Sequence, residues 1–186
     1  MTALARAILL AAALSWPLQP LDDAVQGWMR SHQEPSAHQA MDFVSSKARW
    51  VLIGAAALGL LSGAAGRAFV SELAVVLVPV NLLVEGLKWT VARTRPDGDT
   101  HRRNSSFPSS HAANAFALAA VLTRCWRRSA VPAWLAAGVV AFSRLYLDRH
   151  WLSDVLASAL IALASAWLAA WIFKRRQERT DPSLMT

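Results

Sequence analysis

Residues 151–173 read WLSDVLASALIALASAWLAAWIF, and this stretch is the clearest sign of the architecture of the chain. A transmembrane helix needs about 20 predominantly apolar residues, and the stretch is long enough to supply them. Its one charged residue, Asp154, lies near its start, and a basic run begins directly after its end, at Lys174. We therefore predict a transmembrane helix over residues 151–173.

Five further apolar blocks precede this stretch. They occupy residues 3–18, 50–66, 68–87, 111–123 and 130–147. The chain has 186 residues, of which 55% are hydrophobic and 17% are charged, whereas about 25% of the residues in an average soluble domain are charged. Six spans with short loops use up this length. We therefore expect an all-α fold, a six-transmembrane-helix bundle that forms one integral-membrane domain over residues 1–186.

The segment before the second apolar block has a different character. Residues 3–18 can be a retained first helix or a cleaved signal peptide, and the lack of a clear cleavage site favours the helix. Residues 19–48 are polar and mixed, but some apolar residues recur there at helical spacing: Val25, Trp28, Met29, Met41 and Val44. This spacing is typical of amphipathic helices at a membrane surface. We expect short interfacial helices after the first span.

The net charge of +7 narrows the possible partners. The tryptophans lie mostly in or beside apolar blocks rather than along a basic face, which argues against nucleic-acid binding. Basic loops in a membrane protein instead reflect topology, an anionic lipid surface or an anionic substrate. The one cysteine, Cys125, excludes an internal disulfide and a cysteine-based metal cage.

Six spans place both termini on the same side of the membrane. The basic run at residues 124–128 and the basic tail at 174–186 assign that side to the cytoplasm of a bacterial inner membrane. The Lys and Arg residues of all loops are nearly balanced between the two sides, however. The predicted orientation therefore holds only if the Lys and Arg residues on the outer side are kept there by a functional role.

Three segments gather the unusual residues of the chain, and the six-span topology brings them to one membrane face. Lys88 and Arg95 end the third span, Pro108-Ser109-Ser110-His111 begins the fourth, and the turn between the fifth and sixth spans follows Ser143-Arg144 and contains His150, with Asp154 just beyond it. Charged residues at a membrane are costly unless they are paired or functional. Cations and histidines gathered on one face are what an anion site requires.

The cations among these residues suit a phosphate group. Lys88 and Arg95 can neutralise a dianion, and the planar forks of Arg95 and Arg144 match two phosphate oxygens. The backbone N–H groups that start a helix after Pro108 form an anion cradle. We interpret Arg93 as a headgroup or rim contact.

The histidines suit transfer of that phosphate. His150 and Asp154 are four residues apart, which on a helix places them on one face. The carboxylate can then accept from one ring nitrogen and leave the other as a nucleophile or base. His111 is available as a general acid. No carboxylate or histidine cluster has the spacing of metal ligands, so we expect no metal site.

At these positions the sequence closely resembles the type 2 phosphatidic acid phosphatase superfamily, which includes the vanadium haloperoxidases. The family pattern is Lys, six residues, Arg-Pro; then Pro-Ser-Gly-His; then Ser-Arg, five residues, His, three residues, Asp. Here residues 88–96 read KWTVARTRP, residues 108–111 read PSSH, and residues 143–154 read SRLYLDRHWLSD. The resemblance covers residues 68–173. It implies a six-helix membrane bundle with the site at the outer face and no metal or other cofactor.

The resemblance also implies a role for each site residue. His150 resembles the nucleophile that forms a phosphohistidine, Asp154 the carboxylate that orients it, and His111 the acid that protonates the leaving oxygen. The implied phosphate ligands are Lys88, Arg95, Ser109, Ser110 and Arg144. Ser110 replaces the usual Gly, but its N–H group can still donate, so we expect activity to survive. Asp148-Arg149 stands before His150, where small or apolar residues are common.

We expect a membrane lipid phosphatase that cleaves a lipid phosphomonoester or diphosphate through a phosphohistidine. Candidate substrates are phosphatidic acid, phosphatidylglycerophosphate, undecaprenyl diphosphate and a lipid A phosphate. Transfer of the phosphate to an acceptor other than water stays open. A lipid-phosphate binding or transport protein also stays open, although it has no need of two histidines and the His150–Asp154 pair. The six apolar spans argue against a soluble haloperoxidase.

Overall fold

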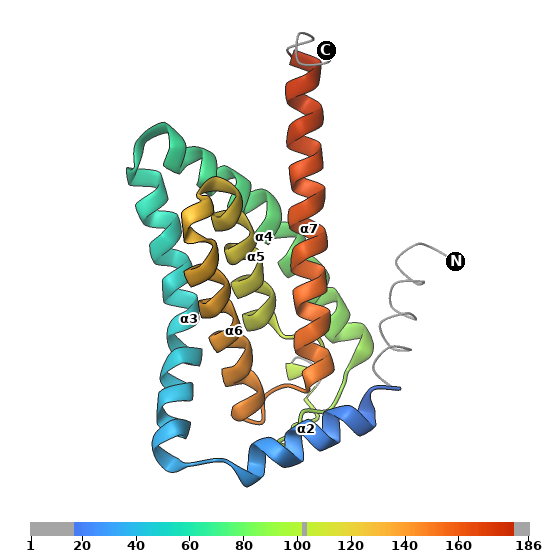
Figure 1. Ribbon diagram of the computed structural model, residues 1–186. Helices are drawn as coiled ribbons and strands as arrows, with labels where there is room; N and C mark the ends of the chain where they lie inside the picture. The colour runs from blue at the N-terminus through green and yellow to red at the C-terminus, as the bar shows by residue number, and fades with distance from the viewer. Residues whose placement is uncertain (1–16, 102–103, 181–186) are drawn as a thin grey trace, which may run out of the picture.

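The computed structural model describes residues 17–101 and 104–180, in which every regular element is a helix (Figure 1). In chain order these are α2 (Gln19–Ser31), α3 (Pro35–Leu61), α4 (Gly63–Val91), α5 (Ser110–Cys125), the short 3-10 helix η2 (Arg127–Ser129), α6 (Ala130–Tyr146) and α7 (Leu152–Thr180). Helices α3 to α7 run up and down in one bundle, and α2 lies across one end of it (Figure 1). The prediction of an all-α fold is confirmed. The predicted span over residues 3–18 lies almost wholly outside the described residues.

Helix α2 is amphipathic, as predicted, and its buried residues Asp22, Gln26 and Met29 recur every three or four positions. The prediction of a further short helix before residue 50 is wrong, because α3 runs unbroken from Pro35 to Leu61. Proline suits the first turn of a helix. No proline or glycine interrupts residues 36–53. Nothing therefore ends the helix at the point where the sequence turns apolar.

Helices α3 and α4 meet in a tight turn at the end of the bundle away from α2 (Figure 1). Gly63 has a φ of +75°, a left-handed conformation that glycine adopts without strain. A Cβ atom at Gly66 would collide with the carbonyl oxygen of Gly59, so the turn needs glycine there too. Both helices are longer than the predicted spans 50–66 and 68–87.

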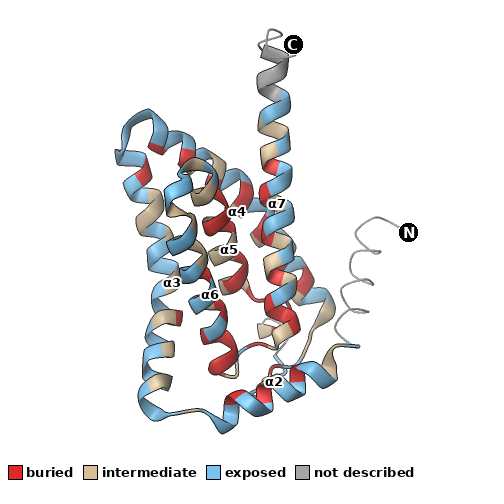
Figure 2. Cartoon of the chain, in the orientation of Figure 1, coloured by how far each residue is buried: buried red, intermediate tan, exposed pale blue. Residues whose placement is uncertain are grey.

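Helix α5 is the central helix of the bundle and contacts α3, α4, α6 and α7. Most of its buried residues are alanines, and Figure 2 shows α5 with buried segments in the middle of the bundle. Small side chains let membrane helices approach closely. The main core cluster joins three helices: Phe69, Leu73, Val76, Val80 and Val84 of α4, Ala113, Ala117, Ala120 and Val121 of α5, and Ala162, Ala166 and Ala169 of α7.

Large apolar side chains cover the outside of the bundle. Among the most exposed are Leu58, Leu61, Val78, Leu82, Val131, Leu135, Leu160 and Trp167. Four segments are long and apolar enough to cross a membrane: Pro35–Leu61, Gly63–Val91, Arg127–Tyr146 and Leu152–Arg175. These correspond to four of the six predicted spans. That α5, with 16 residues, and residues 3–18 also cross the membrane stays a prediction.

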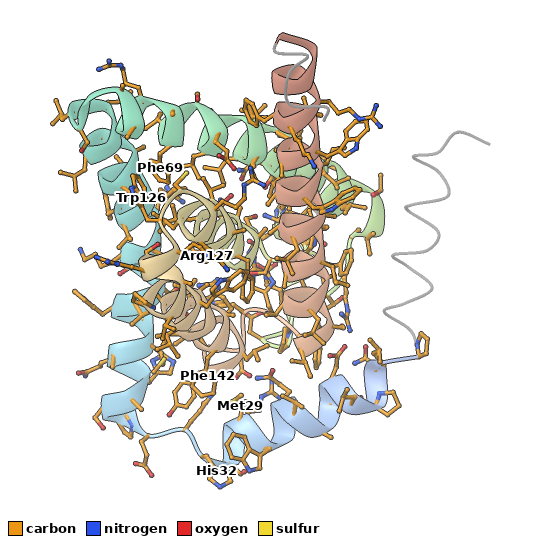
Figure 3. The ribbon with its side chains drawn as sticks, turned by 45° about the horizontal axis from the view of Figure 1, so that its top comes forward. Met29, His32, Phe69, Trp126, Arg127 and Phe142 are labelled. Atoms are coloured by element: carbon orange, nitrogen blue, oxygen red, sulfur yellow. The ribbon has the colours of Figure 1, made fainter. Side chains whose placement is uncertain are left out.

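Different residues pack at the two ends of the bundle. At the end away from α2, the rings of Phe69 and Trp126 pack with their centroids 5.1 Å apart (Figure 3). At the other end, Met29 lies on the side of α2 that faces the bundle (Figure 3). Helices α4 and α6 end there, and α5 and α7 begin there (Figure 1). The three segments with the predicted site residues therefore all lie at the α2 end.

Candidate active site

A cavity of about 1040 Å³ opens between α3, α4, α5 and α6. Six of the eight predicted site residues line it: Lys88, Arg95, Ser110, His111, Arg144 and His150. The other two, Ser109 and Asp154, are fully buried and hold the surrounding backbone in place. The fold thus gathers these residues around one cavity, although Lys88 and His150 lie 62 positions apart in the chain.

Lys88 lies in the last turn of α4, where the macrodipole of the helix favours a cation. Its ammonium donates to the hydroxyl of Ser110 at 2.6 Å and to the Glu85 carboxylate at 3.1 Å. Ser110, which stands in place of the usual glycine, therefore contacts a predicted phosphate ligand directly. The helix ends at Val91 and is capped by Ala92, whose φ is +48°, and the chain then enters the loop that carries Arg95.

The loop over residues 92–109 holds Arg95 against its own backbone. The Arg95 guanidinium donates to the carbonyl oxygen of Asn104 at 2.7 Å and to its side-chain Oδ1 at 2.6 Å. Only 7% of the residue is exposed. Burial lowers the pKa of Arg95, yet an arginine stays charged in proteins. Asn104 fixes the orientation of this cation, and neither the motif nor the spacing points to it.

Arg144 lies near the end of α6 and is also buried. Its Nη1 group donates to the hydroxyl of Ser45 on α3. Among the side chains of residues 17–101 and 104–175, the Nε atom of Arg144 is the one buried nitrogen or oxygen without a hydrogen-bond partner. A buried donor left unpaired is costly, and an anion in the cavity would supply the missing acceptor. Arg144 is therefore suited to bind an anionic group.

The start of α5 supplies backbone donors to the same space. Ser109 is the N-cap, and its hydroxyl accepts from the Ala112 N–H at 3.4 Å. The first N–H groups of a helix have no acceptor within the helix, so those of Ser110 and His111 can bind an anion. The Ser109 N–H donates to Ser158 of α7 at 2.8 Å instead. That Ser109 is a phosphate ligand stays a prediction.

His150 is buried in the turn between α6 and α7. Its Nδ1 atom lies 2.6 Å from the carbonyl oxygen of Ser106. A carbonyl only accepts, so Nδ1 carries the proton and Nε2 keeps the lone pair. Burial, followed by the nearby charge of Arg144, lowers the pKa of His150 well below its ordinary value. The ring is therefore neutral at physiological pH, as a nucleophile must be.

The expected direct hydrogen bond between His150 and Asp154 is not formed. The distance from Nδ1 to the nearer carboxylate oxygen is 3.9 Å, too long for a hydrogen bond. The assumption of a shared helical face is wrong, because α7 begins at Leu152, two residues after His150. Ser106 bridges the pair, since its carbonyl accepts from His150 and its hydroxyl donates to Asp154.

Asp154 belongs to a buried network that the sequence analysis missed. Arg93 donates to Asp154 at 2.7 Å through Nη1 and to Asp22 of α2 at 2.7 Å through Nη2. Asp22 also accepts from the N–H and the hydroxyl of Ser153, at 2.8 and 2.6 Å. The interpretation of Arg93 as a rim contact is wrong, because its side chain is only 11% exposed and joins two carboxylates. The available signal in the sequence was Asp22, a carboxylate at helical spacing from the apolar residues of α2, which needs a cation partner when it is buried.

The pair Asp148-Arg149 ties the turn to its neighbours. Asp148 accepts from Arg30 of α2 at 3.1 Å, and Arg149 donates to Asp97 at 3.3 Å. Arg149 also lines the cavity. These contacts fasten the backbone on which His150 stands to α2 and to the loop over residues 92–109.

Within the described part of the chain, no group of three or more His, Cys, Asp or Glu side chains is placed to hold a metal ion. That the reaction needs no metal stays a prediction.

A family model described as the PAP2 superfamily matches residues 69–178, more than half of the chain. The chain belongs to the PAP2 superfamily. This confirms the resemblance that the three motifs indicate. The match covers α5, α6, most of α4 and most of α7, and therefore the helices that carry the predicted site residues.

Two curated proteins are similar to parts of this PAP2 chain. A lipid A 1-phosphatase from Porphyromonas gingivalis is 35% identical over 94 residues, which are 48% of this chain and 20% of that protein. A lipid A 4'-phosphatase from Bacteroides thetaiotaomicron is 38% identical over 72 residues, which are 36% of this chain and 30% of that protein. The chain thus spans less than a third of the length of each of these relatives.

Two solved structures share the fold. One is a transmembrane PAP2 type phosphatidylglycerolphosphate phosphatase from Bacillus subtilis, with a TM-score of 0.72 and 22% identity, covering 93% of this chain and 95% of that one. The other is Aquifex aeolicus LpxE, with a TM-score of 0.71 and 20% identity, covering 81% and 94%. At these identities the similarity establishes the fold of the PAP2 chain.

Proposed function

We propose that the chain is a multi-pass lipid phosphatase of a bacterial inner membrane, with its active site at the extracytoplasmic face and both termini in the cytoplasm. One observation carries the proposal: a buried His150, whose Nδ1 atom is hydrogen-bonded to the Ser106 carbonyl, shares a cavity with Lys88, Arg95 and Arg144. A nucleophile with a free ring nitrogen beside fixed positive charge suits attack on a phosphate dianion.

In the first step, Nε2 of His150 attacks phosphorus and forms a P–N bond. The P–O bond to the lipid breaks at the opposite side, and the leaving oxygen takes a proton from His111, which the negative charge of the bound phosphate keeps protonated. Lys88, Arg95, Arg144 and the N–H groups at the start of α5 hold the oxygens of the transferred group. The Ser106 carbonyl keeps the proton of the His150 ring on Nδ1, so Nε2 keeps the lone pair that attacks phosphorus.

In the second step, water attacks the phosphohistidine. His111, which has lost its proton, accepts one from the water as the new P–O bond forms. The P–N bond breaks, inorganic phosphate leaves the site, and His150 returns to its neutral form. Asp154 acts on His150 through Ser106 and through the start of α7, so its proposed role is to orient the nucleophile.

The lining of the cavity supports a lipid substrate. Beyond the cationic end, its walls are apolar, with Leu52 of α3, Leu118 and Leu122 of α5, and Val140 of α6. Ligand cavities typically combine such apolar walls with a few polar groups that orient the ligand. The similar proteins are named as phosphatases of lipid A and of phosphatidylglycerolphosphate. Phosphatidic acid and undecaprenyl diphosphate belong to the same chemical class.

The test is phosphate release by the purified full chain in detergent micelles that contain one of these four lipids. We expect inorganic phosphate from at least one lipid and none after the substitution His150→Ala. His38→Ala is the matched control, because His38 is exposed on α3 and does not line the cavity. A folded parent protein that releases no phosphate from any of the four lipids, or a fully active His150→Ala variant, would overturn the proposal.

A further inference from the structure

Two asparagine side chains face each other inside the cavity wall. Asn81 of α4 donates to Oδ1 of Asn114 on α5 at 2.9 Å, and Asn114 donates back to Oδ1 of Asn81 at 3.2 Å. Asn81 also donates to the carbonyl oxygen of Leu77 at 2.8 Å. Both residues line the cavity and are partly exposed to it. The mechanism above makes no use of this amide pair.

The amide pair keeps hydrogen-bonding capacity that its own contacts do not use. An asparagine side chain has two N–H donors and a carbonyl oxygen with two lone pairs. The bonds to Leu77 and Asn114 engage both donors of Asn81, but the bond to Asn81 engages only one of the two donors of Asn114. Polar groups at membrane depth are costly unless they are paired or functional. The second N–H of Asn114 is therefore a donor that suits an oxygen of a bound ligand.

The amide pair lies between the cationic end of the cavity and its apolar depth. On α5, Asn114 follows His111 by three residues, which is about 5 Å along the helix axis. On α4, Asn81 precedes Lys88 by seven residues, which is two helical turns on the same face. One further turn along α5 from Asn114 stands Leu118, where the lining is apolar.

We propose that Asn81 and Asn114 form a polar subsite that binds the linkage oxygens of an acylated lipid phosphate, and this inference rests on the proposed function. An acylated glycerol or sugar carries ester, amide or hydroxyl oxygens within a few bonds of its phosphate, at the depth of the pair. A polyprenyl phosphate has only hydrocarbon beyond its phosphate. The subsite therefore favours acyl lipids over polyprenyl phosphates.

The decisive variant is the double substitution Asn81→Leu with Asn114→Leu, which replaces both partners by apolar side chains and leaves neither amide unpaired. We compare kcat/KM for phosphatidic acid, farnesyl phosphate and soluble 4-nitrophenyl phosphate in identical micelles. The expected result is a loss of about two- to tenfold with phosphatidic acid, the equivalent of one neutral hydrogen bond. Farnesyl phosphate and 4-nitrophenyl phosphate should be cleaved as fast as by the parent.

Two further variants keep the test decisive. Asn114→Ala removes the proposed donor and leaves Asn81 bonded to Leu77, so it gives the same selective loss if the double variant does not fold. Thr123→Val is the matched control, because the hydroxyl of Thr123 on α5 accepts from Trp134 of α6 outside the cavity lining, and its removal should leave the substrate ratio unchanged. An equal loss on all three substrates, or no loss on any, would overturn the subsite. A parent protein inactive on farnesyl phosphate and on all four lipids of the phosphate-release test would instead refute the proposed function.

Discussion

The contact of Arg93 with two buried carboxylates is the most informative one to break. Its guanidinium spans from Asp22 on α2 to Asp154 on α7, at 2.7 Å from each. Both carboxylates are about 1% exposed or less. The substitution Arg93→Met keeps much of the side-chain volume but removes the charge. It leaves two carboxylates buried without their cation.

The expected cost in stability is large. Removing one partner of a buried ion pair costs about 3–5 kcal/mol, because the remaining charge is left uncompensated. The further substitution Asp22→Asn removes one of the two stranded charges, so the double variant should regain about 1–3 kcal/mol relative to Arg93→Met. This recovery would show that Arg93 acts on the carboxylates rather than by packing alone.

The expected effect on turnover follows from the hydrogen bonds that connect Arg93 to His150. Arg93 does not line the cavity, but it fixes Asp154, which accepts from the Ser106 hydroxyl, and the Ser106 carbonyl holds His150. A misplacement of a reacting group by about 1 Å can lower the rate by about 100-fold. We therefore expect kcat to fall by about that factor in the Arg93→Met variant, with KM changed less than about twofold.

The measurements are the unfolding free energy in detergent and the kcat and KM for a lipid phosphate. Arg30→Met is the matched control, since Arg30 pairs with Asp148 at the same end of the bundle but its side chain is 50% exposed. Such an exposed pair contributes about 0.2–1 kcal/mol. An Arg93→Met variant as stable as the Arg30→Met variant, with the parent kcat, would refute this reasoning.

Other predictions concern the two histidines, pH, metal and the sidedness of the membrane. His150→Ala should abolish turnover of every phosphate ester. His111→Ala should still release a burst of about one nitrophenol per site from 4-nitrophenyl phosphate, since nitrophenolate leaves without a proton. Equal inactivity of both folded variants would show that the roles of the two histidines are assigned wrongly. The burst should persist below pH 6.5, the ordinary pKa of histidine, because burial and the nearby arginines lower the pKa of His150 and keep its ring neutral; a burst that halves near pH 6.5 would contradict this. EDTA should leave phosphate release unchanged and vanadate should inhibit it; activity lost in EDTA and restored by Mg²⁺ would refute metal independence. In a Cys125→Ser background, a membrane-impermeant thiol reagent should label Thr100→Cys but not Arg128→Cys in intact cells; the reverse labelling would invert the topology.

Much of the fold could be predicted because membrane helices are recognised by length and hydropathy alone. The predicted span 130–147 agrees with α6 within one residue, and the spans 111–123 and 151–173 both begin within one residue of α5 and α7. The starts of α3 and α4 could not be predicted in this way. The hydropathy of the sequence changes at residue 50, but the backbone of α3 stays helical through this change. The boundary between α3 and α4 is set by the turn beside Gly63.

The motifs predicted which residues surround the cavity, because their spacing brings helix ends together once the bundle is formed. They did not predict how those residues are held. Asn104 orients Arg95, Ser45 binds Arg144, and Ser106 stands between His150 and Asp154. Asn104 and Ser106 lie in a loop and Ser45 lies in α3, and serine and asparagine occur in so many such places that their spacing carries no signal of these contacts.

By itself, the sequence determined the all-α class, the order of the helices and the membership of the PAP2 superfamily, since hydropathy and motif spacing are properties of neighbouring residues. Only the tertiary structure decided which carboxylates share Arg93, which carbonyl selects the tautomer of His150, and that Asn81 faces Asn114. These contacts join residues 33 to 71 positions apart. A hydrogen bond depends on distance and direction in space, and the packing of α2, α4, α5 and α7 sets both.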